Sequence, residues 1–338
     1  MIYIDEIPAL VIESYLNNPR DTLGFLGPVG AGKSEAVVQA SEELRKLTGN
    51  PDFFLATVIL SQMSEEDFMI PWPEAELAKQ GVYKHLTHGN WVFPKDAAGI
   101  IFLDEALNGS DGVKKSVQNI LSSFSINGHP LPEKVMILVA SNRKEDRAGV
   151  TSINTAFGNR VEWHEVDIRF SGWEHWAIQC NIDQSVITFL KKFPQHMYDF
   201  KNDRLINATP RTWAKTSHVL GSKWELQRIS GLVGEGIATE FLTFRALFGE
   251  FPEIEEIRRN PAKAKMPASL DAQFALANAL AMWTTRDHWV DFVKYAERMN
   301  NEYKFMYMRE AARLHPDFGL KATQPWIDYI LTNQKDLI

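Results

Sequence analysis

The chain has 338 residues, of which 45% are hydrophobic and 23% are charged, and its formal net charge is −7. These values predict about two globular domains with a substantial core. The negative charge argues against an extended nucleic-acid surface, although a local basic pore is compatible with it. The one cysteine, Cys180, cannot form an internal disulfide, and no apolar run reaches the ~18 residues of a membrane span. The first residues also lack the layout of a secretory signal, so we expect a cytoplasmic protein without a membrane span.

The first elements of the chain surround a glycine-rich loop. Residues 7–16 carry apolar side chains at helical spacing and predict a helix that packs on a sheet. Residues 22–26 predict a short apolar strand, and residues 36–47 predict a helix that stops before Gly49. The loop between this strand and this helix fits G-x-x-x-x-G-K-[ST], the pattern of a phosphate-binding loop. The dinucleotide-binding pattern G-x-G-x-x-G is not matched.

The residue types of this loop suit a polyphosphate. Glycines allow backbone N–H groups to surround the phosphates, and the N-terminus of the following helix adds partial positive charge. Lys33 would reach the β and γ phosphates of ATP, and the Ser34 hydroxyl would ligate Mg²⁺. An ordinary glycine turn is the structural alternative. The residues expected to bind the nucleotide are Gly27, Pro28, Val29, Gly30, Ala31, Gly32, Lys33, Ser34 and Glu35.

A second buried strand is predicted at residues 57–61, and an unusual segment follows it. This segment contains two prolines, the exposed-looking aromatic residues Phe68 and Trp72, and an apparent hairpin with arms at residues 82–84 and 91–93. We interpret residues 62–94 as an insertion that carries a functional loop.

Two carboxylates end the next predicted strand. Residues 100–103 are all apolar, as in a buried parallel strand, and Asp104 and Glu105 follow directly. Open α/β sheets bind ligands at the carboxyl ends of their strands. Asp104 would hold Mg²⁺, and Glu105 would act as the general base that polarises the attacking water. A carboxylate pair that caps a helix is the alternative.

Further along, two more polar residues flank predicted strands. Residues 113–124 predict a helix, and residues 135–142 predict a buried strand that ends at Asn142, level with Asp104. The Asn142 amide could orient the attacking water, or it could only cap the strand. Arg160 precedes a strand at residues 161–168, where it could stabilise the γ-phosphate of a neighbouring subunit. A surface salt bridge is the alternative for Arg160, and two other arginines, Arg143 and Arg147, are weaker candidates.

From residue 170 onward the sequence predicts helices only. Thr209 suits an N-cap and Pro210 a first helical position, which places Arg211 in the first turn, where it could face a nucleotide. The tail from residue 270 is rich in aromatic residues, which we interpret as core residues rather than a ligand-binding cluster. No Cys and His spacing suggests a zinc site.

Taken in order, the glycine loop, the Asp104 and Glu105 pair, Asn142, Arg160 and Arg211 resemble the motifs of AAA+ ATPases. Shorter strings are similar to the MoxR-like branch, within the helix-2-insert clade. They lie at residues 59–63, 100–108, 140–143, 148–150, 159–160, 209–213 and 231–236. The resemblance covers most of residues 20–245.

The resemblance implies a domain organisation. A three-layer αβα nucleotide-binding domain with a parallel central sheet would occupy residues 1–168, with an insert at about residues 62–94 that reaches a central pore. A helical lid would occupy residues 169–252, and a C-terminal helical extension residues 253–338. The copies would assemble as a homo-oligomeric ring, commonly of six subunits.

The resemblance also implies roles for residues and partners. Asn142 would be the first sensor, Arg160 the arginine finger that acts on a neighbour, and Arg211 the second sensor. Relatives are chaperone-like motors that remodel proteins, often with a partner that contains a von Willebrand factor A domain.

We therefore predict a Mg²⁺-dependent ATPase with an α/β P-loop fold. Its catalytic residues would be Lys33, Glu105, Asn142, Arg160 and Arg211, and its metal ligands Ser34 and Asp104. Three alternatives stay open. One is a DNA-directed motor or helicase loader in which Lys79, Lys84 and Trp91 face the nucleic acid. The others are a nucleotide-dependent binding switch with little turnover and a small-molecule kinase, which the paired carboxylates argue against.

Overall fold

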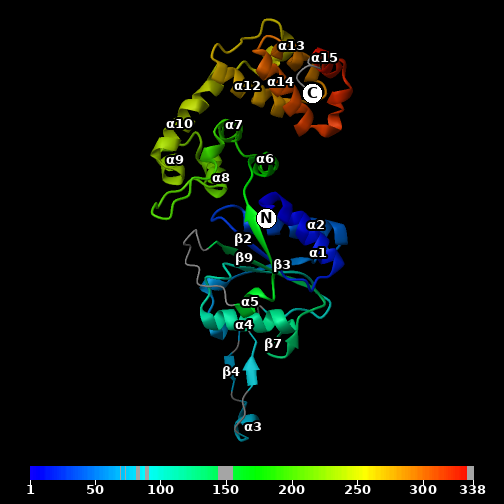
Figure 1. Ribbon diagram of the computed structural model, residues 1–338, viewed down its shortest axis with the longest axis vertical. Helices are drawn as coiled ribbons and strands as arrows, with labels where there is room; N and C mark the ends of the chain where they lie inside the picture. The colour runs from blue at the N-terminus through cyan, green and yellow to red at the C-terminus, as the bar shows by residue number, and fades with distance from the viewer. Residues whose placement is uncertain (69, 73, 81–83, 88–90, 144–154, 333–338) are drawn as a thin grey trace. The chain divides into compact units, whose positions relative to one another are not determined.

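The computed structural model describes residues 1–68, 70–72, 74–80, 84–87, 91–143 and 155–332 (Figure 1). These residues form two compact units. The sheet unit comprises residues 1–176, 200–205 and 209–211, and the helical unit comprises residues 177–199, 206–208 and 212–338.

A parallel sheet forms the centre of the sheet unit. Its strand order is β1-β10-β2-β9-β6-β3, and every neighbouring pair is parallel. The strands are β1 (Ile2–Tyr3), β2 (Leu23–Gly27), β3 (Phe54–Ile59), β6 (Ala98–Asp104), β9 (Lys134–Asn142) and β10 (Glu162–Asp167). The predicted parallel central sheet is confirmed. The second predicted strand is shifted, because β3 begins at Phe54 and the chain turns into a 3-10 helix (η2, Leu60–Gln62) where the strand was expected to continue.

Helices cover both faces of this sheet, which gives the predicted three layers (Figure 1). On one face lie α1 (Ile7–Asn17) and α2 (Lys33–Thr48), whose apolar residues join Phe25, Phe102 and Leu138 in one core. On the other face lie α4 (Asp111–Ser123) and α5 (Thr155–Gly158), whose apolar residues join Leu103, Ile137 and Val139 in a second core. Alternate residues of β6 and β9 thus enter different cores, as the period of a strand requires.

Two glycines of the sheet are explained by bulky neighbours across the strands. Gly24 pairs with Trp163, and Gly99 pairs with Phe54. A Cβ atom on Gly24 would lie 2.5 Å from the Trp163 ring, and one on Gly99 would lie 2.5 Å from the Phe54 ring. The missing side chains therefore leave room for the two aromatic rings on the neighbouring strands.

The insert differs from its prediction. Its hairpin pairs β4 (Ile70–Trp72) with β5 (Lys84–Leu86), with α3 (Ala75–Ala78) between them, and residues 91–93 are not a strand. Residues 82–83 and 88–90, which the prediction also used, lie outside the described residues. A second short hairpin, β7 (Ser125–Ile126) with β8 (His129–Pro130), follows α4.

Of the two aromatic residues of the insert that were expected to be exposed, Phe68 is buried, and the Trp72 side chain lies outside the described part of the structure. Phe68 and Trp91 are 1% and 3% exposed, and their rings stack with centroids 5.3 Å apart. The Trp91 indole donates a hydrogen bond to the Asp67 carbonyl at 3.1 Å. Burial of these rings adds to the core beneath α4, so they anchor the base of the insert.

The helical unit contains nearly all the remaining elements, and the expected helical region after the sheet is confirmed. The first helix after β10, α6 (Phe170–Gln179), begins in the sheet unit. The others are α7 (Gln184–Lys192), α8 (Pro210–Val219), α9 (Glu225–Val233), α10 (Glu235–Ala246), α11 (Ile254–Arg259), α12 (Leu270–Trp283), α13 (Trp289–Ala296), α14 (Asn301–Leu314) and α15 (Gln324–Thr332). Among the described helices, none is long and apolar enough to cross a membrane.

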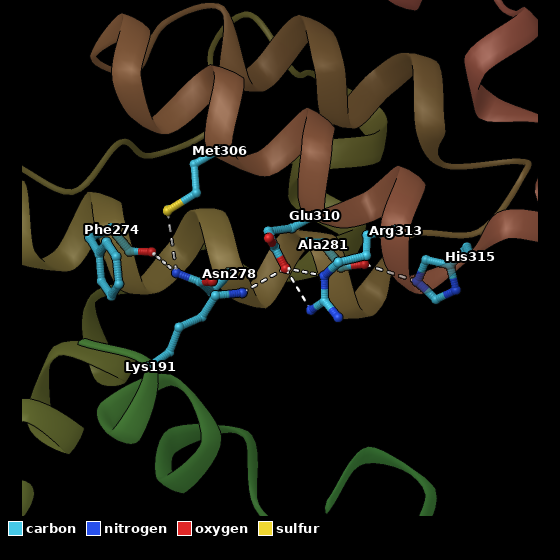
Figure 2. Close-up of polar contacts among 8 residues, drawn as sticks. All are labelled: Lys191, Phe274, Asn278, Ala281, Met306, Glu310, Arg313 and His315. Atoms are coloured by element: carbon cyan, nitrogen blue, oxygen red, sulfur yellow. Dashed lines mark hydrogen bonds and ion pairs between the residues drawn. The ribbon is translucent and has the colours of Figure 1, made fainter. Parts of the chain in front are cut away.

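Apolar packing and ion pairs join the early and late helices of the helical unit. Trp289 and Tyr295 are buried in a core formed by α11 to α15, as expected for the aromatic tail. Lys191 of α7 donates to Glu310 of α14 at 2.6 Å, and Arg313 donates to the same carboxylate oxygen at 2.7 Å (Figure 2). The next residue of α7, Lys192, pairs with Asp271 of α12. Both lysines of the last turn of α7 thus bind the C-terminal helices.

Candidate functional site

Three central strands end together and place polar residues at one edge of the sheet. Because β2, β9 and β6 are parallel, their carboxyl ends lie at the same edge. Gly27 pairs with Asn142, and Asp104 pairs with Ile59 at the end of β3. The strand order sets β9 directly between β2 and β6. The phosphate loop, Asn142 and Asp104 therefore meet, although they are far apart in the sequence.

The phosphate loop adopts a conformation that requires two of its glycines. Gly30 and Gly32 have φ angles of +70° and +108°, in the left-handed region that other residues rarely adopt. A Cβ atom on Gly30 would lie 2.9 Å from the hydroxyl oxygen of Thr209. Gly32 caps α2, which begins at Lys33. The loop therefore passes directly into the N-terminus of a helix, an arrangement that suits phosphate binding.

Lys33 is buried and turned toward the loop. Its ammonium group donates to the Gly27 and Pro28 carbonyls, both at 2.9 Å, and to Asn142 Oδ1 at 3.0 Å. All these acceptors lie at the carboxyl ends of β2 and β9. The amine is thus held at the phosphate loop, and it links the loop to Asn142.

Ser34 and Asp104 form a second pair at the same edge. The Ser34 hydroxyl donates to Asp104 Oδ2 at 2.6 Å, and Asp104 Oδ1 accepts the backbone N–H of Glu105 at 2.8 Å. A hydroxyl and a carboxylate are hard oxygen donors of the kind that Mg²⁺ uses, together with water and substrate phosphates. These residues fit magnesium. In the described residues, no cluster of three or more His, Cys, Asp or Glu side chains could hold a metal by itself.

Glu105 has a strained backbone. Its φ angle is +53°, which is uncommon for a residue with a side chain and is found often at functional sites. Its carboxylate accepts a hydrogen bond from the hydroxyl of Ser61. No role was predicted for Ser61, although it is the polar residue that ends the predicted apolar strand at residues 57–61. The structure thus fixes the carboxylate beside Asp104.

Residues before β2 and after β10 border the first turn of α2. A Cβ atom on Gly32 would lie 3.7 Å from Ile4 Cγ2, so the N-terminal residues touch the phosphate loop. The indole N–H of Trp176, on α6, donates to Glu35 Oε1 at 3.2 Å. Neither contact was predicted, since nothing in the local pattern links residues 4 or 176 to the loop.

Arg160 lies away from the phosphate loop of its own subunit. It precedes β10, whose Glu162 pairs with Leu23 at the start of β2, four residues before Gly27. At ~3.3 Å per residue, the beginning of β10 is roughly 13 Å from the loop along the strands. The guanidinium is exposed and donates to the Ser122 hydroxyl of α4. Arg160 therefore does not join the other predicted residues within one copy.

The competing arginines differ in position. Arg143 donates to the Val166 carbonyl and lies 3.9 Å from the Asp167 carboxylate, at the phosphate-loop edge. Arg147 lies outside the described residues. Arg211 belongs to the sheet unit, and its backbone N–H donates to the Gly30 carbonyl at 3.3 Å, while its side chain is exposed. The start of α8 thus touches the phosphate loop directly.

The solved structures that are similar to this chain share little of its sequence. No protein-family model matches the chain, and no curated protein does either. Among solved structures, it is similar to the Thermotoga maritima RuvB Holliday junction branch migration motor, at 14% identity and a TM-score of 0.40, over 85% of this chain and 83% of that one. It is also similar to the replication initiator DnaA bound to AMPPCP and single-stranded DNA, at 13% identity and a TM-score of 0.39, over 97% and 92%. A third similar structure is domain III of the Thermotoga maritima replication initiation protein DnaA, at 14% identity and a TM-score of 0.42, over 70% of this chain and 89% of that one.

Proposed function

We propose that the chain is a Mg²⁺-dependent ATPase of the AAA+ type. The observation that carries the proposal is the meeting of Lys33, Ser34, Asp104, Glu105 and Asn142 at one sheet edge, around a loop with two left-handed glycines. Phosphoryl transfer needs mainly positioning and charge stabilisation, and these residue types supply both.

In the proposed mechanism, each residue has a separate role. The backbone of the loop and Lys33 bind the triphosphate, and Lys33 stabilises the charge that develops on the γ-phosphoryl oxygens. Asn142 orients a water molecule, and Glu105 takes its proton as it attacks the γ-phosphorus, so that ADP leaves. Magnesium, held by Ser34 and Asp104 when bound, would neutralise the charge of the phosphates.

The decisive experiment measures phosphate release from ATP with and without Mg²⁺. We expect wild type to release phosphate steadily when ATP and Mg²⁺ are both present. Lys33→Ala should lose this turnover and should also fail to bind a fluorescent ADP analogue. Binding without turnover would favour the nucleotide-dependent switch. Failure of wild type to bind ATP or ADP would refute the proposal.

For the use of hydrolysis, we propose remodelling of a protein partner by a homo-oligomeric ring of this chain. This part of the proposal rests on the motif resemblance. The same resemblance supports a ring of six subunits, a partner with a von Willebrand factor A domain, a lid at residues 169–252 and Arg211 as a sensor. The DNA-directed alternative is weakened, because Trp91, one of the three residues that would face the nucleic acid, is buried. Turnover that is stimulated by single-stranded DNA in a salt-sensitive manner would restore it.

A further inference from the structure

The N-terminal segment, residues 3–6, is held in place at the phosphate loop. Strand β1 pairs with the end of β10, with Tyr3 opposite Asp167. The next residue, Ile4, is the one whose side chain lies against Gly32. The N-terminal segment therefore forms part of the surface next to the phosphate loop.

One arginine, Arg169, contacts three residues of this segment. Arg169 Nε lies 3.0 Å from both carboxylate oxygens of Asp5, and Arg169 Nη2 also donates to Asp5. The same Nη2 lies 3.2 Å from Glu6 Oε1, and the guanidinium carbon lies 4.5 Å from the centroid of the Tyr3 ring. The Asp5 hydrogen bonds, with the nearby carboxylates, raise the pKa of Arg169. A planar, forked guanidinium can make this set of contacts at once, and an ammonium group cannot.

The same segment is also fixed by α6. A Cβ atom on Gly172 would lie 2.2 Å from Asp5 Oδ1 and 2.7 Å from Asp5 Cβ, so Asp5 occupies the space of a missing side chain. Four residues further along α6, Trp176 donates to Glu35 in the first turn of α2. Arg169 therefore stands where β10 passes into α6, and it joins two elements that both touch the phosphate-binding region.

We propose that Arg169 is a positioning residue for nucleotide binding, acting by fixing the N-terminal segment against the phosphate loop. The inference rests on the proposed function. It predicts that loss of the Arg169 contacts weakens nucleotide binding and leaves the chemical step nearly unchanged, because Arg169 touches none of the residues assigned to hydrolysis.

The first test compares Arg169→Ala and Arg169→Lys with wild type. We expect the Kd for a fluorescent ADP analogue and the KM for ATP to rise about tenfold in Arg169→Ala, with kcat within about twofold of wild type. Arg169→Lys should recover only part of the affinity, since a lysine cannot bridge Asp5 and Tyr3 together. Arg258→Ala is the matched control, because Arg258 is as exposed (39% against 37%) and pairs with Glu255 of the helical unit at 2.8 Å.

A second variant, Gly172→Ala, perturbs the N-terminal segment through α6 instead of through Arg169. Gly172→Ala should push Asp5 away and raise Kd and KM in the same manner. If Gly172 mattered only for the stability of α6, alanine would stabilise this helix and leave Kd and KM unchanged, because alanine favours helices over glycine. Gly236→Ala is its control, since Gly236 lies in α10 and a Cβ atom there would meet nothing within 4 Å.

The outcomes separate the two proposals. Unchanged Kd and KM in folded Arg169→Ala and Gly172→Ala would overturn the role of Arg169 while the ATPase proposal stands. A fall in kcat at unchanged KM would also overturn it. If wild type binds no nucleotide, the proposed function itself fails. Thermal unfolding of all five variants identifies any that lose their fold. If Arg169→Ala is unfolded, the Kd and KM of Gly172→Ala decide the test.

Discussion

At the scale of single residues, the backbone of Glu105 is the clearest sign of function. A left-handed φ angle costs a residue with a side chain free energy, and the fold keeps this conformation directly after a buried strand. The result is a carboxylate beside Asp104, with Ser61 as its hydrogen-bond donor. A carboxylate that was only a helix cap would not need this backbone geometry.

We predict that Glu105→Gln separates binding from turnover. Glutamine keeps the shape of the side chain but cannot accept the proton of the attacking water. Phosphate release should fall about 10²- to 10⁴-fold, the usual range for loss of a general base, while the Kd for a fluorescent ADP analogue stays near that of wild type. Glu162→Gln, an exposed glutamate at the start of β10, is the control. Turnover that persists undiminished in Glu105→Gln would assign the proton to another group.

At the scale of elements, a comparison of two glycines distinguishes the effect of the phosphate loop on nucleotide affinity from the effect of backbone strain on stability. Gly30 and Gly49 both have left-handed φ angles, yet only Gly30 faces a neighbour, the Thr209 side chain. Alanine should lower the free energy of unfolding by about 1–2 kcal/mol at either position. We predict that Gly30→Ala in addition weakens nucleotide binding by at least about tenfold, because its methyl group disturbs the loop at Thr209. Titration of the ADP analogue checks this, and equal affinity of the two variants would contradict it.

The contact between α7 and α14 gives a pH-dependent prediction. Burial raises the pKa of Glu310, but hydrogen bonds from Arg313 and Lys191 outweigh this effect, so the pKa is lowered overall. A carboxyl whose pKa is lowered in the folded state stabilises the fold above its unfolded pKa of about 4.3, and this contribution is lost as the pH falls through the lower folded value.

Glu310→Gln should therefore be less stable than wild type at pH 7, and the difference should shrink below about pH 4. Urea unfolding at several pH values measures it, with Glu297→Gln, an exposed glutamate of the same unit, as control. A stability difference that is the same at pH 7 and pH 3 would show that the ion pairs in Figure 2 do not cause it.

At the scale of the whole molecule, the position of Arg160 bears on assembly. It lies at the start of β10, while the phosphate loop lies at the other end of the neighbouring strand β2. If Arg160 acts on a phosphate, that phosphate must be bound to another copy. The proposed ring provides such a copy, since head-to-tail contacts place one subunit's edge against the next subunit's site.

We predict that two inactive variants restore activity when mixed. Lys33→Ala cannot bind ATP but retains Arg160, and Arg160→Ala binds ATP but lacks the arginine. An equal mixture should regain about a quarter of wild-type phosphate release, as random neighbours in a ring require. Each variant alone is the control, with assembly checked by light scattering. A mixture that assembles but stays inactive would argue against action between copies.

The local patterns of the chain were sufficient for much of the site. The strand, loop and helix around Lys33 and the apolar strands that end at Asp104 and Asn142 have signatures within a few residues, so their ends were close to those observed. Parallel strands share one edge for their carboxyl ends, and the predicted residues meet there for that reason.

Only the tertiary structure decided the remaining features, because they depend on pairs that are distant in sequence. The hairpin of the insert pairs residues 70–72 with residues 84–86, and Trp91 is buried by stacking on Phe68. Arg169 meets Asp5 from 164 positions away. Such contacts arise when strands and helices pack, and packing depends on the shapes of whole surfaces rather than on a repeat that a short stretch of sequence can display.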